Sequence, residues 1–525
     1  MSTGVIIKKN SYFDSVFLMQ VAKGISNEPG VDQAVALMGT ENNKTLLIKM
    51  GVKEKEIDSV SSNDVVIFIE GSKSPVDLVL NNIDRWFTRK TTSLQARAHT
   101  LDEALTIQPK ANLAVISVPG RYAAREAREA LEKGLNVFLF SNNVSVEEEL
   151  SLKQYADQQG LLIMGPDCGT AIIAGVGIGF ANSIRRGKIG VVGVTGTGLQ
   201  EITCLIHQAG LGISQAIGTG SRDLSDEIGG FSTFKALELL EGDPETELIV
   251  LISKPPGIRT LDNLVKKLNK CPKPVVTCIL GTRQFRNKLK LKQSIVSTDT
   301  ISEAAMNAAA IVEGKKTKLP GISITNFLGR IQKEKKLLAT NQRYLRGIFA
   351  GGTFCYQAQQ LMAAGGLQIH SNVPLAGMIK LTDPTTSIAN SMVDMGEDYF
   401  TQSSPHPMID SRLSKQRIIK EAHDPEVAVI LLDFILGFMS SENPAGELAP
   451  AIMEAKKIRK NDGGHLIFIA SVCGTDLDTQ NLKEQLNTLE EIGVIVMPSS
   501  AHAALLALEV VRDRQNCDAG KQCHL

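Results

Sequence analysis

Two glycine-rich turns in the sequence have the composition of phosphate-binding sites. The first reads VVGVTGTGLQE, from Val191 to Glu201, where an apolar strand runs into a helix. Such a turn aims backbone N–H groups and the positive end of a helix dipole at one point, which suits a phosphate. The alternative is a tight strand-to-helix connection without a ligand, and the sequence contains no Walker-type motif. The phosphate ligands predicted here are Thr195, Gly196, Thr197 and Gly198.

The second turn, FAGGTFCYQA from Phe349 to Ala358, opens a later unit in the same way. A phosphate held between two helix N-termini would gain from both dipoles, each contributing about 1 kcal/mol. Two equivalent turns are therefore more informative than either one alone. The phosphate ligands predicted on this side are Gly351, Gly352 and Thr353.

Charged residues follow two other strands of the same region. Arg222 and Asp223 lie after a strand in IGTGSRDLSDEIGG, where the arginine could bind a carboxylate or a phosphate. The two could instead pair with each other. Lys254 follows the strand that ends in SKPPG, either as a cation in the site or as an exposed loop lysine.

The segment from Asp394 to Arg412 is dense in ionisable groups and is predicted to be irregular. His406, which lies between two prolines, is the residue that we predict to transfer a proton. With Arg222 and Lys254 it forms the predicted catalytic set. The spacing around His406 matches no metal motif, and we predict no metal. The predicted substrate-binding residues are Gly218, Thr219, Gly220, Asp223, Ser253, Asp394 and Asp410.

Composition describes an ordinary globular protein, with 43% apolar and 21% charged residues and a formal net charge of zero. That balance does not call for nucleic acid or an anionic membrane as a partner. No apolar run is long enough to span a bilayer, and no secretory signal opens the chain. The eight cysteines form no C-x-x-C pair, so we expect free thiols and a cytoplasmic protein. Cys168, in GPDCGT, is expected to be a packed residue rather than a nucleophile, because no histidine lies near it in sequence.

Apolar strand-like runs alternate with amphipathic helical stretches along the chain, which predicts an α/β fold with parallel sheets and crossover helices. A chain of 525 residues is too long for one hydrophobic core. The predicted division is a small N-terminal α/β unit at 1–95, a Rossmann unit at 96–186, a flavodoxin-like unit at 187–314, a linker at 315–346 and a second flavodoxin-like unit at 347–515. The third and fourth units look like two copies of one fold.

The Rossmann unit has polar residues just past its strand ends, where ligands bind in open α/β sheets. Gly120, Asn142 and Asn143 are the predicted cofactor-binding residues, for CoA or a nucleotide. The unit lacks the glycine-rich fingerprint of dinucleotide-binding proteins. Ser145 and Glu148 have the spacing of a capping box and predict the start of a helix.

Longer motifs resemble a known superfamily. GPDCGT, KIGVVGVTGTGLQE and IGTGSRDLSDEIGG are similar, in order and spacing, to the α subunit of succinyl-CoA synthetase. SKPP, FAGGT, DMGEDYFTQSSPHPMID and LLDFILGF extend the resemblance to the FdrA-type acyl-CoA synthetase-like proteins, over nearly the whole chain. The resemblance implies a CoA-binding-type Rossmann domain and two synthetase-type ligase domains, whose two helices share one phosphate site beginning at Thr195–Gly198 and Gly351–Thr353. It also implies partner subunits and an oligomer.

The sequence departs from the synthetases at the residue that they phosphorylate. Their α subunit carries a histidine after the strand that matches PVVTCIL, and here that stretch reads GTRQFRNKLKLKQSI. The strand end SKPP also lacks the glutamate that orients this histidine, and no segment can hold an ATP-grasp domain. The resemblance therefore does not carry phosphohistidine chemistry to this chain.

Three functions follow as alternatives. FdrA-type proteins are linked to oxamate carbamoyltransferase in allantoin and purine breakdown, which implies carbamoyl phosphate as donor and a small carboxylate or amide as acceptor. The second alternative is an acyl-CoA synthetase subunit, of the NDP-forming type, that binds CoA. The third is an inactive scaffold that binds CoA or a nucleotide.

Overall fold

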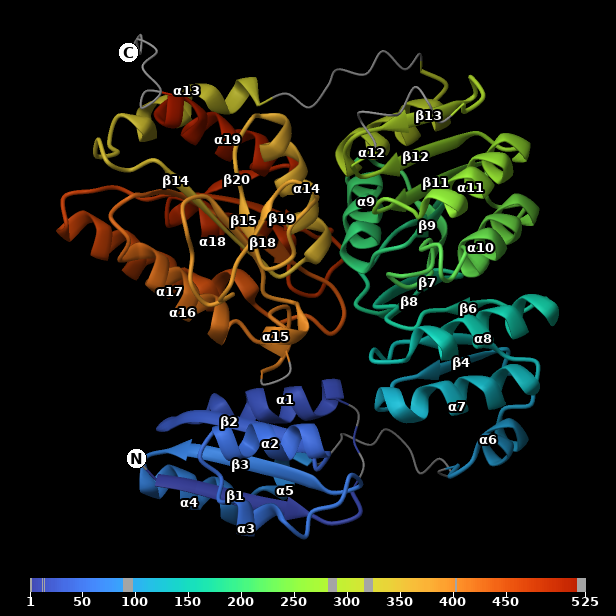
Figure 1. Cartoon of the computed structure of the whole chain (residues 1–525), viewed down its shortest axis with the longest axis horizontal. Helices are drawn as coiled ribbons and strands as arrows, with labels where there is room; N and C mark the ends of the chain where they lie inside the picture. Colours follow the sequence, from blue (N-terminus) through green and yellow to red (C-terminus); the bar gives the residue numbers. More distant parts are fainter. Residues whose placement is uncertain are drawn as a thin grey trace.

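The computed structural model describes residues 2–11, 13, 15–87, 98–281, 290–315, 324–401 and 404–516. These residues form four sheets, one in each of four units (Figure 1). The N-terminal unit lies beside the fourth unit, and the second unit lies beside the third. No helix in the described part of the chain combines the length and hydrophobicity needed to cross a membrane.

The N-terminal unit has an antiparallel sheet, which corrects the expectation of parallel sheets throughout. The strand order is β1-β3-β2, and β3 runs antiparallel to both neighbours. Strand β3 reads VVIFIEG and is buried along nearly its whole length, so it takes the central place between two strands. The elements are β1 (Ser2–Lys8), α1 (Ser15–Ser26), β2 (Val31–Met38), α2 (Glu41–Lys49), α3 (Glu54–Ile57), β3 (Val65–Gly71), α4 (Lys73–Asn81) and α5 (Asp84–Phe87).

The second unit is the predicted parallel βαβαβ arrangement, with strand order β4-β5-β6. The predicted capping box is confirmed, since the Ser145 hydroxyl accepts from the Glu148 N–H at 3.2 Å and the Glu148 carboxylate accepts from the Ser145 N–H at 3.2 Å. The elements are α6 (Leu101–Ile107), β4 (Leu113–Ile116), α7 (Gly120–Glu132), β5 (Asn136–Leu139), α8 (Val146–Gln158) and β6 (Ile163–Met164).

The third unit has a seven-stranded sheet of order β13-β12-β11-β9-β10-β7-β8. Five strands are parallel, and the hairpin of β7 and β8 adds an antiparallel edge next to β10. This hairpin lies before residue 187, so the sheet begins earlier in the chain than the predicted third unit. The elements are β7 (Thr170–Ile173), β8 (Val176–Gly179), β9 (Arg186–Gly193), α9 (Gly196–Gln208), β10 (Ile213–Gly218), α10 (Phe231–Gly242), β11 (Leu248–Ser253), α11 (Ile258–Lys270), β12 (Val275–Ile279), β13 (Ile295–Thr298) and α12 (Ile301–Val312).

The fourth unit has a parallel seven-stranded sheet of order β16-β15-β17-β14-β18-β19-β20. The sequence pattern missed β15, β16 and β17, which are short and not continuously apolar. The elements are α13 (Thr325–Lys335), β14 (Tyr344–Phe349), α14 (Gly352–Ala364), β15 (His370–Ser371), β16 (Ile379–Lys380), β17 (Ser391–Asp394), α15 (Asp398–Thr401), α16 (Arg412–Ala422), β18 (Val427–Ile435), α17 (Pro444–Asn461), β19 (Ile467–Cys473), α18 (Leu482–Glu491), β20 (Ile495–Met497) and α19 (Ser500–Asn516).

Part of the predicted linker at 315–346 belongs to the fourth unit. Helix α13 packs Ile331 into the core, and Arg346 is buried in β14. The Arg346 guanidinium is paired with Glu421 at 2.8 Å and with Asp424 at 2.6 Å. Residues 316–323 lie outside the described residues. The charged residues of the predicted linker therefore include one, Arg346, that forms ion pairs inside the fourth unit.

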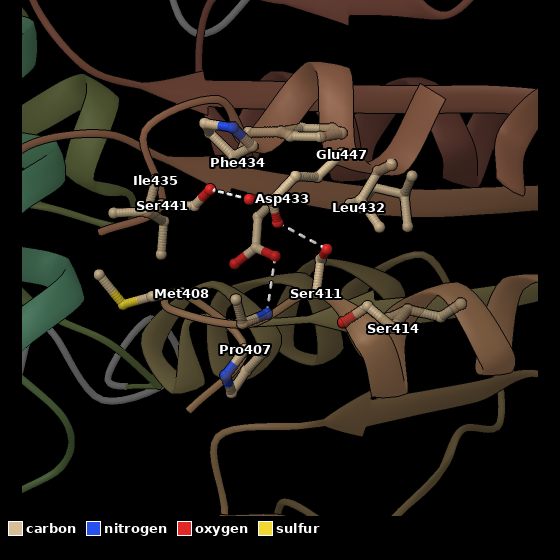
Figure 2. A pocket seen from close by; sticks show the side chains of 14 residues that line it. Pro407, Met408, Ser411, Ser414, Leu432, Asp433, Phe434, Ile435, Ser441 and Glu447 are labelled. Carbon is tan, nitrogen blue, oxygen red and sulfur yellow. Dashed lines mark hydrogen bonds between the residues drawn. The ribbon is translucent and has the colours of Figure 1, made fainter. Parts of the chain in front are cut away.

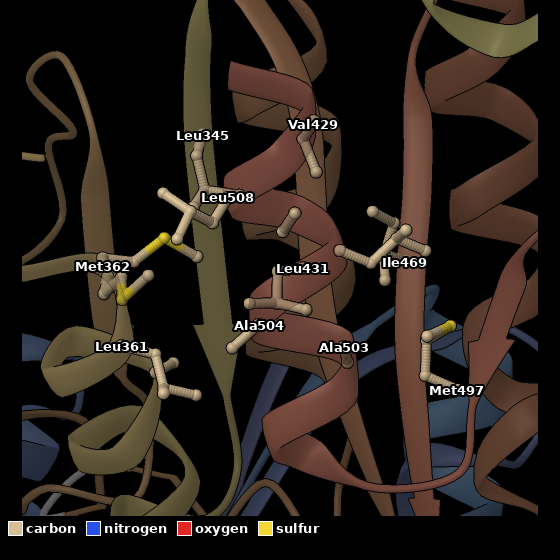
Figure 3. Close-up of a cluster of buried hydrophobic side chains, with 14 of the residues drawn as sticks. Leu345, Leu361, Met362, Val429, Leu431, Ile469, Met497, Ala503, Ala504 and Leu508 are labelled. Atoms are coloured by element: carbon tan, nitrogen blue, oxygen red, sulfur yellow. The ribbon is translucent and has the colours of Figure 1, made fainter. Parts of the chain in front are cut away.

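Two apolar layers enclose the fourth sheet. All nine residues of β18 are buried, as expected for a parallel strand that is covered on both faces. On one face Leu345, Leu431 and Ile469 of the strands pack against Met362 of α14 and Leu508 of α19 (Figure 3). Helices α16 and α17 contribute to the cluster on the other face. These layers fix where α14 begins relative to the sheet.

The third and fourth units are joined by buried polar contacts around α9. The Glu201 carboxylate in α9 accepts from the N–H and the hydroxyl of Ser500, both at 2.8 Å. Burial raises the pKa of Glu201 to about 7 against these two hydrogen bonds. Asn182 donates to the Leu436 carbonyl at 2.9 Å and to Asp478 at 2.8 Å. Helices α9 and α14 are consequently held against each other.

A buried group of three charged side chains joins the second unit to the third, and removing its cation tests this architecture. Lys153 of α8 contacts Glu149 at 2.9 Å and Asp223 at 2.7 Å, and all three side chains are at most 1% exposed. Lys153→Met would leave the buried Asp223 without its cation and Glu149 with Arg222 alone, so we expect a loss of about 3–5 kcal/mol in the free energy of unfolding. The measurement is the midpoint of thermal unfolding.

The matched control is Lys188→Met, because Lys188 pairs with Glu247 at 2.6 Å with both side chains more than half exposed. Its expected cost is below about 1 kcal/mol. Equal midpoints for the two variants would contradict the structural role of Lys153.

Candidate functional site

The structure brings the two glycine-rich turns together. The hydroxyl groups of Thr195 and Thr353 share a hydrogen bond, and the Thr353 N–H donates to the Thr197 hydroxyl at 3.4 Å. A Cβ atom on Gly198 would lie 3.1 Å from a methyl group of Thr353. The N-termini of α9 and α14, which are far apart in sequence, therefore face each other across the interface of the third and fourth units.

The two helix N-termini differ in the groups that occupy them. The N–H groups of Gly196, Thr197 and Gly198 have no acceptor among the described residues, as expected for the first turn of a helix that can take an anion. At α14, by contrast, the N–H groups of Ala350 and Gly351 both donate at 2.7 Å to the Asp433 carboxylate.

A second carboxylate lies against the start of α14. A Cβ atom on Gly352 would lie 2.5 Å from Oδ2 of Asp394, so this glycine allows the carboxylate to approach the backbone. Burial raises the pKa of Asp394 and of Asp433 to about 7, against the hydrogen bonds from the Gly396 N–H and from the turn of α14. The two turns are therefore unequal, because Asp433 binds the N–H groups of Ala350 and Gly351 just before α14, and phosphate binding at either turn stays a prediction.

His406 lies next to Asp394. A Cβ atom on Gly396 would be 2.7 Å from Nε2 of His406 and 3.2 Å from Oδ1 of Asp394. Nδ1 of His406 accepts from the Met408 N–H at 3.2 Å, which assigns the ring proton to Nε2. Burial lowers the pKa of His406 to about 4, so the ring is neutral at pH 7 and presents a donor. Its ring packs against Phe180 of the third unit, with the centroids 5.9 Å apart.

Lys254 supplies a positive charge to the same place. It follows β11, whose last residue is the buried Ser253, and its ammonium lies 5.7 Å from the ring centroid of Tyr356 in α14. The charge of Lys254 acts to lower the pKa of Asp394, although the effect of burial is larger. The site thus combines a free helix N-terminus, one cation, two carboxylates and a neutral histidine.

Arg222 and Asp223 are not brought into this site, which corrects their predicted roles. The Arg222 guanidinium contacts Glu149 at 2.9 Å and 2.8 Å and donates to the Val144 carbonyl at 2.8 Å. Asp223 binds Lys153 and accepts from the Thr233 N–H at 2.8 Å. The two do not pair with each other, and both serve the junction of the second and third units.

The segment around Gly218 packs against the GPDCGT motif. A Cβ atom would lie 2.3 Å from the Thr170 carbonyl oxygen at Gly218 and 2.4 Å from the Pro166 carbonyl oxygen at Gly220. Between them, the Thr219 hydroxyl pairs with the hydroxyl of Thr233 at 3.3 Å. The two glycines among these predicted substrate ligands therefore allow their backbone to pack closely against the backbone of the GPDCGT motif. Burial raises the pKa of the Cys168 thiol to about 12, as expected for a packed cysteine.

Two further predictions fall outside the site. Asp410 is engaged by Arg412, whose N–H and Nε donate to it at 2.9 Å and 2.8 Å. In the second unit, a Cβ atom on Gly120 would lie 2.4 Å from the carbonyl oxygens of both Asn142 and Asn143. The three predicted cofactor ligands thus lie together, as strand ends of one sheet do, and their binding of CoA or a nucleotide stays a prediction.

Sequence reasoning missed Asp433. The signal was available, because an aspartate inside the otherwise apolar strand VAVILLDFI is an exception that needs partners. Behind Asp433 lies a small cavity, with about 30 Å³ of space for the centres of water molecules, between β18 and the 407–414 segment (Figure 2). That volume is enough for a water molecule.

Comparisons with protein families match three parts of the chain. Residues 348–510 match a family profile described as CoA-ligase, and residues 184–269 match a CoA binding domain. The latter match falls on the unit that was predicted to be a ligase domain, rather than on residues 96–186. Residues 1–103 match a profile described as the AllF heavy metal-associated domain.

Among curated proteins, the uncharacterized protein YahF of Escherichia coli is 43% identical over 514 residues, which cover 97% of this chain and 99% of YahF. The α subunit of the ADP-forming succinate–CoA ligase of Aquifex aeolicus is 31% identical over 189 residues, or 35% of this chain and 60% of that subunit.

Among solved structures, a dinucleotide-forming acetyl-coenzyme A synthetase of Ca. Korarchaeum cryptofilum is 16% identical, with coverage of 86% of this chain and 95% of that chain and a TM-score of 0.32. ATP citrate lyase of Methanothrix soehngenii is 13% identical, with coverage of 81% and 86% and a TM-score of 0.33.

The residues present do not fit the heavy metal in the name of the N-terminal profile. Thiolates are the ligands that soft metals select, and the first 103 residues contain no cysteine. Among the described residues, no group of three or more histidine, cysteine, aspartate or glutamate side chains is placed to hold a metal ion.

The two carboxylates of the site, Asp394 and Asp433, predict that its affinity for anions depends on pH. Sulfate does not titrate near neutrality, whereas Asp394 and Asp433 lose protons as the pH rises through about 7. We expect sulfate affinity to fall roughly tenfold between about pH 5.5 and about pH 8.5, because the ionised carboxylates repel the anion. Isothermal titration calorimetry at several pH values measures this dependence.

Asp394→Asn should flatten the dependence, and Asp157→Asn, at an exposed position on α8, should leave it unchanged. An affinity for sulfate that is the same at all pH values in the unmodified protein would contradict the assignment of these carboxylates to the site.

Proposed function

We propose that this chain, which belongs to the family of YahF and to the succinyl-CoA synthetase-like superfamily with CoA-binding and CoA-ligase domains, is a subunit of a carbamoyltransferase. The enzyme would move a carbamoyl group between carbamoyl phosphate and a small amide or carboxylate acceptor such as oxamate. The match of residues 1–103 to an AllF profile supports a place in allantoin breakdown, with partner subunits. The relatives of the ligase domains are themselves subunits of ligases.

The observation that carries the proposal is the unequal pair of helix N-termini. The free N–H groups of Gly196, Thr197 and Gly198 can hold the phosphate of a donor, while Asp433 already occupies the turn of α14. A phosphate bound at α9 then has the other groups of the site beside it. Such a site stabilises a departing phosphate through fixed dipoles and needs no phosphohistidine.

The remaining groups have the properties that the transfer needs. The acceptor nitrogen attacks the carbamoyl carbon, the bond from that carbon to the phosphate oxygen breaks, and the phosphate leaves with the bonding electrons. The proton of the acceptor nitrogen goes to Asp394, whose pKa near 7 suits a base. His406 was the predicted proton-transfer residue, but its Nδ1 is already engaged, so its Nε2–H serves as a donor that orients the substrate.

Lys254 supplies the positive charge that the carboxylate of the acceptor needs in this proposal. Its ammonium, which lies near Tyr356 and Asp394, can bind the carboxylate of the acceptor. Arg222, which was the other candidate for this role, is engaged by Glu149. The acceptor carboxylate therefore lies on the third-unit side of the site, near the end of β11.

An acyl-CoA synthetase subunit is the second candidate, and the CoA-binding and CoA-ligase matches favour it. Against it, residues 281–295 contain no histidine, although this is where the synthetases are phosphorylated. Most of that stretch, 282–289, lies outside the described residues. The two candidates differ in their products, since the synthetase requires ATP and CoA and forms ADP.

The proposal is tested by phosphate release from carbamoyl phosphate, with the purified protein alone and with the products of neighbouring genes, in the presence of oxamate and related amides. We expect release that depends on the acceptor. Gly196→Asp should lower the rate at least about a hundredfold, because its carboxylate would occupy the N–H groups of α9 and exclude phosphate.

Gly196→Ala is the matched control, since a Cβ atom there meets nothing closer than 3.4 Å and adds no charge. It should retain most of the activity. Absence of release with every acceptor, together with ADP formation that requires ATP and CoA, would overturn the proposal and establish the ligase.

A further inference from the structure

Helix α1 of the N-terminal unit reaches into the fourth unit through one lysine. The Lys23 ammonium donates to the Ile409 carbonyl at 2.8 Å, to the Ser441 hydroxyl at 3.2 Å and to the Glu447 carboxylate at 2.7 Å. Three acceptors satisfy all three hydrogens of an ammonium group. The side chains of Lys23 and Glu447 are each only 23% exposed, so the contact is better shielded from water than an ordinary surface pair.

The carbonyl that Lys23 binds belongs to the turn that presents His406. The N–H groups of Ile409 and Asp410 donate back to the His406 carbonyl at 2.8 Å and 3.1 Å, and the Met408 N–H binds Nδ1 of the ring. A displacement of Ile409 is therefore transmitted to both the backbone and the ring of His406. The same turn is fixed on its other side, where the Ser441 N–H donates to the Met408 carbonyl at 2.8 Å.

Glu447 is the anchor on the fourth unit. Its other oxygen accepts from the Ser411 hydroxyl at 2.7 Å, just after the turn, and Figure 2 shows this contact at the edge of the cavity behind Asp433. Burial acts to raise the pKa of Glu447, but the hydrogen bonds from Lys23, Ser441 and Ser411 outweigh it and lower the pKa below its usual value. The carboxylate is thus ionised and matched to the ammonium.

A second contact from the same helix supports the first. Nη1 of Arg412 donates to the Ser26 hydroxyl at 3.3 Å, one helical turn beyond Lys23. Arg412 also binds Asp410, so α1 holds the segment on both sides of Asp410. With no cysteine in the first 103 residues, a soft-metal role does not account for this unit.

We propose that the N-terminal unit is an intramolecular clamp, in which Lys23 is a positioning residue that fixes the His406 turn against Asp394. The role of His406 in transfer rests on the proposed function, whereas the clamp itself does not. A heavy-metal-associated fold thereby serves as a docking element for the site of another unit.

The test observes His406 directly in the full-length protein. Histidine labelled with ¹³C gives one ring signal for each of eight residues, and His406→Gln assigns the signal of interest. Lys23→Met should shift or broaden the His406 signal alone. It should also speed amide hydrogen exchange at Ile409 and Asp410 roughly tenfold or more, because a charge-assisted hydrogen bond is lost. Lys23→Arg should restore much of both, since a guanidinium can reach the same acceptors.

Lys8→Met is the matched control, because Lys8 has the same 23% exposure but pairs with Asp84 inside its own unit. It should leave the His406 signal and the exchange rates unchanged, and thermal unfolding shows whether each variant is folded. A His406 signal and exchange rates that are identical in folded Lys23→Met and in the unmodified protein would overturn the clamp. Neither readout needs turnover, so loss of the carbamoyltransferase proposal would leave this result intact.

Discussion

The apposition of two helix N-termini is the constraint on which the rest of this structure depends. Helices α9 and α14 begin in different units, and the pair of Thr195 and Thr353 marks where they meet. The unpartnered dipoles of two such termini would repel each other across so short a distance. Asp433 offsets this repulsion by accepting from the N–H groups of Ala350 and Gly351, just before α14, whereas no carboxylate of the described residues binds the first N–H groups of α9.

The carboxylates of the site follow from the same constraint. The buried Asp433 accepts from the N–H groups of Ala350 and Gly351 just before α14, and burial raises its pKa to about 7. Asp394, at the end of β17, lies beside it, and Lys254 offsets part of their combined charge. His406 stays neutral in this setting because burial lowers its pKa to about 4.

The outer units hold the two central ones. The second unit is joined to the third by the buried group of Lys153, Glu149 and Asp223, in which Arg222 takes part. The N-terminal unit contacts the fourth at the turn that carries His406 and meets the second unit through the hydroxyl groups of Ser62 and Tyr122, 3.4 Å apart. Some charged residues near strand ends, such as Arg222, therefore join two units, whereas others, such as Lys254, face the candidate site.

The sequence by itself determined the α/β class, the strands β9, β10, β11 and β12 of the third sheet, the capping box at Ser145 and the two glycine-rich turns, because apolar periodicity and glycine spacing are local properties of the chain. It could not decide the antiparallel N-terminal sheet, which depends on strand pairing, or the short strand that ends at Asp394. Arg222 and Asp394 were both predicted to be site residues, yet one is engaged by Glu149 and the other faces α14. Only the tertiary structure separates them, because the partner of a charge is set by residues distant in sequence that the packing of the units brings near.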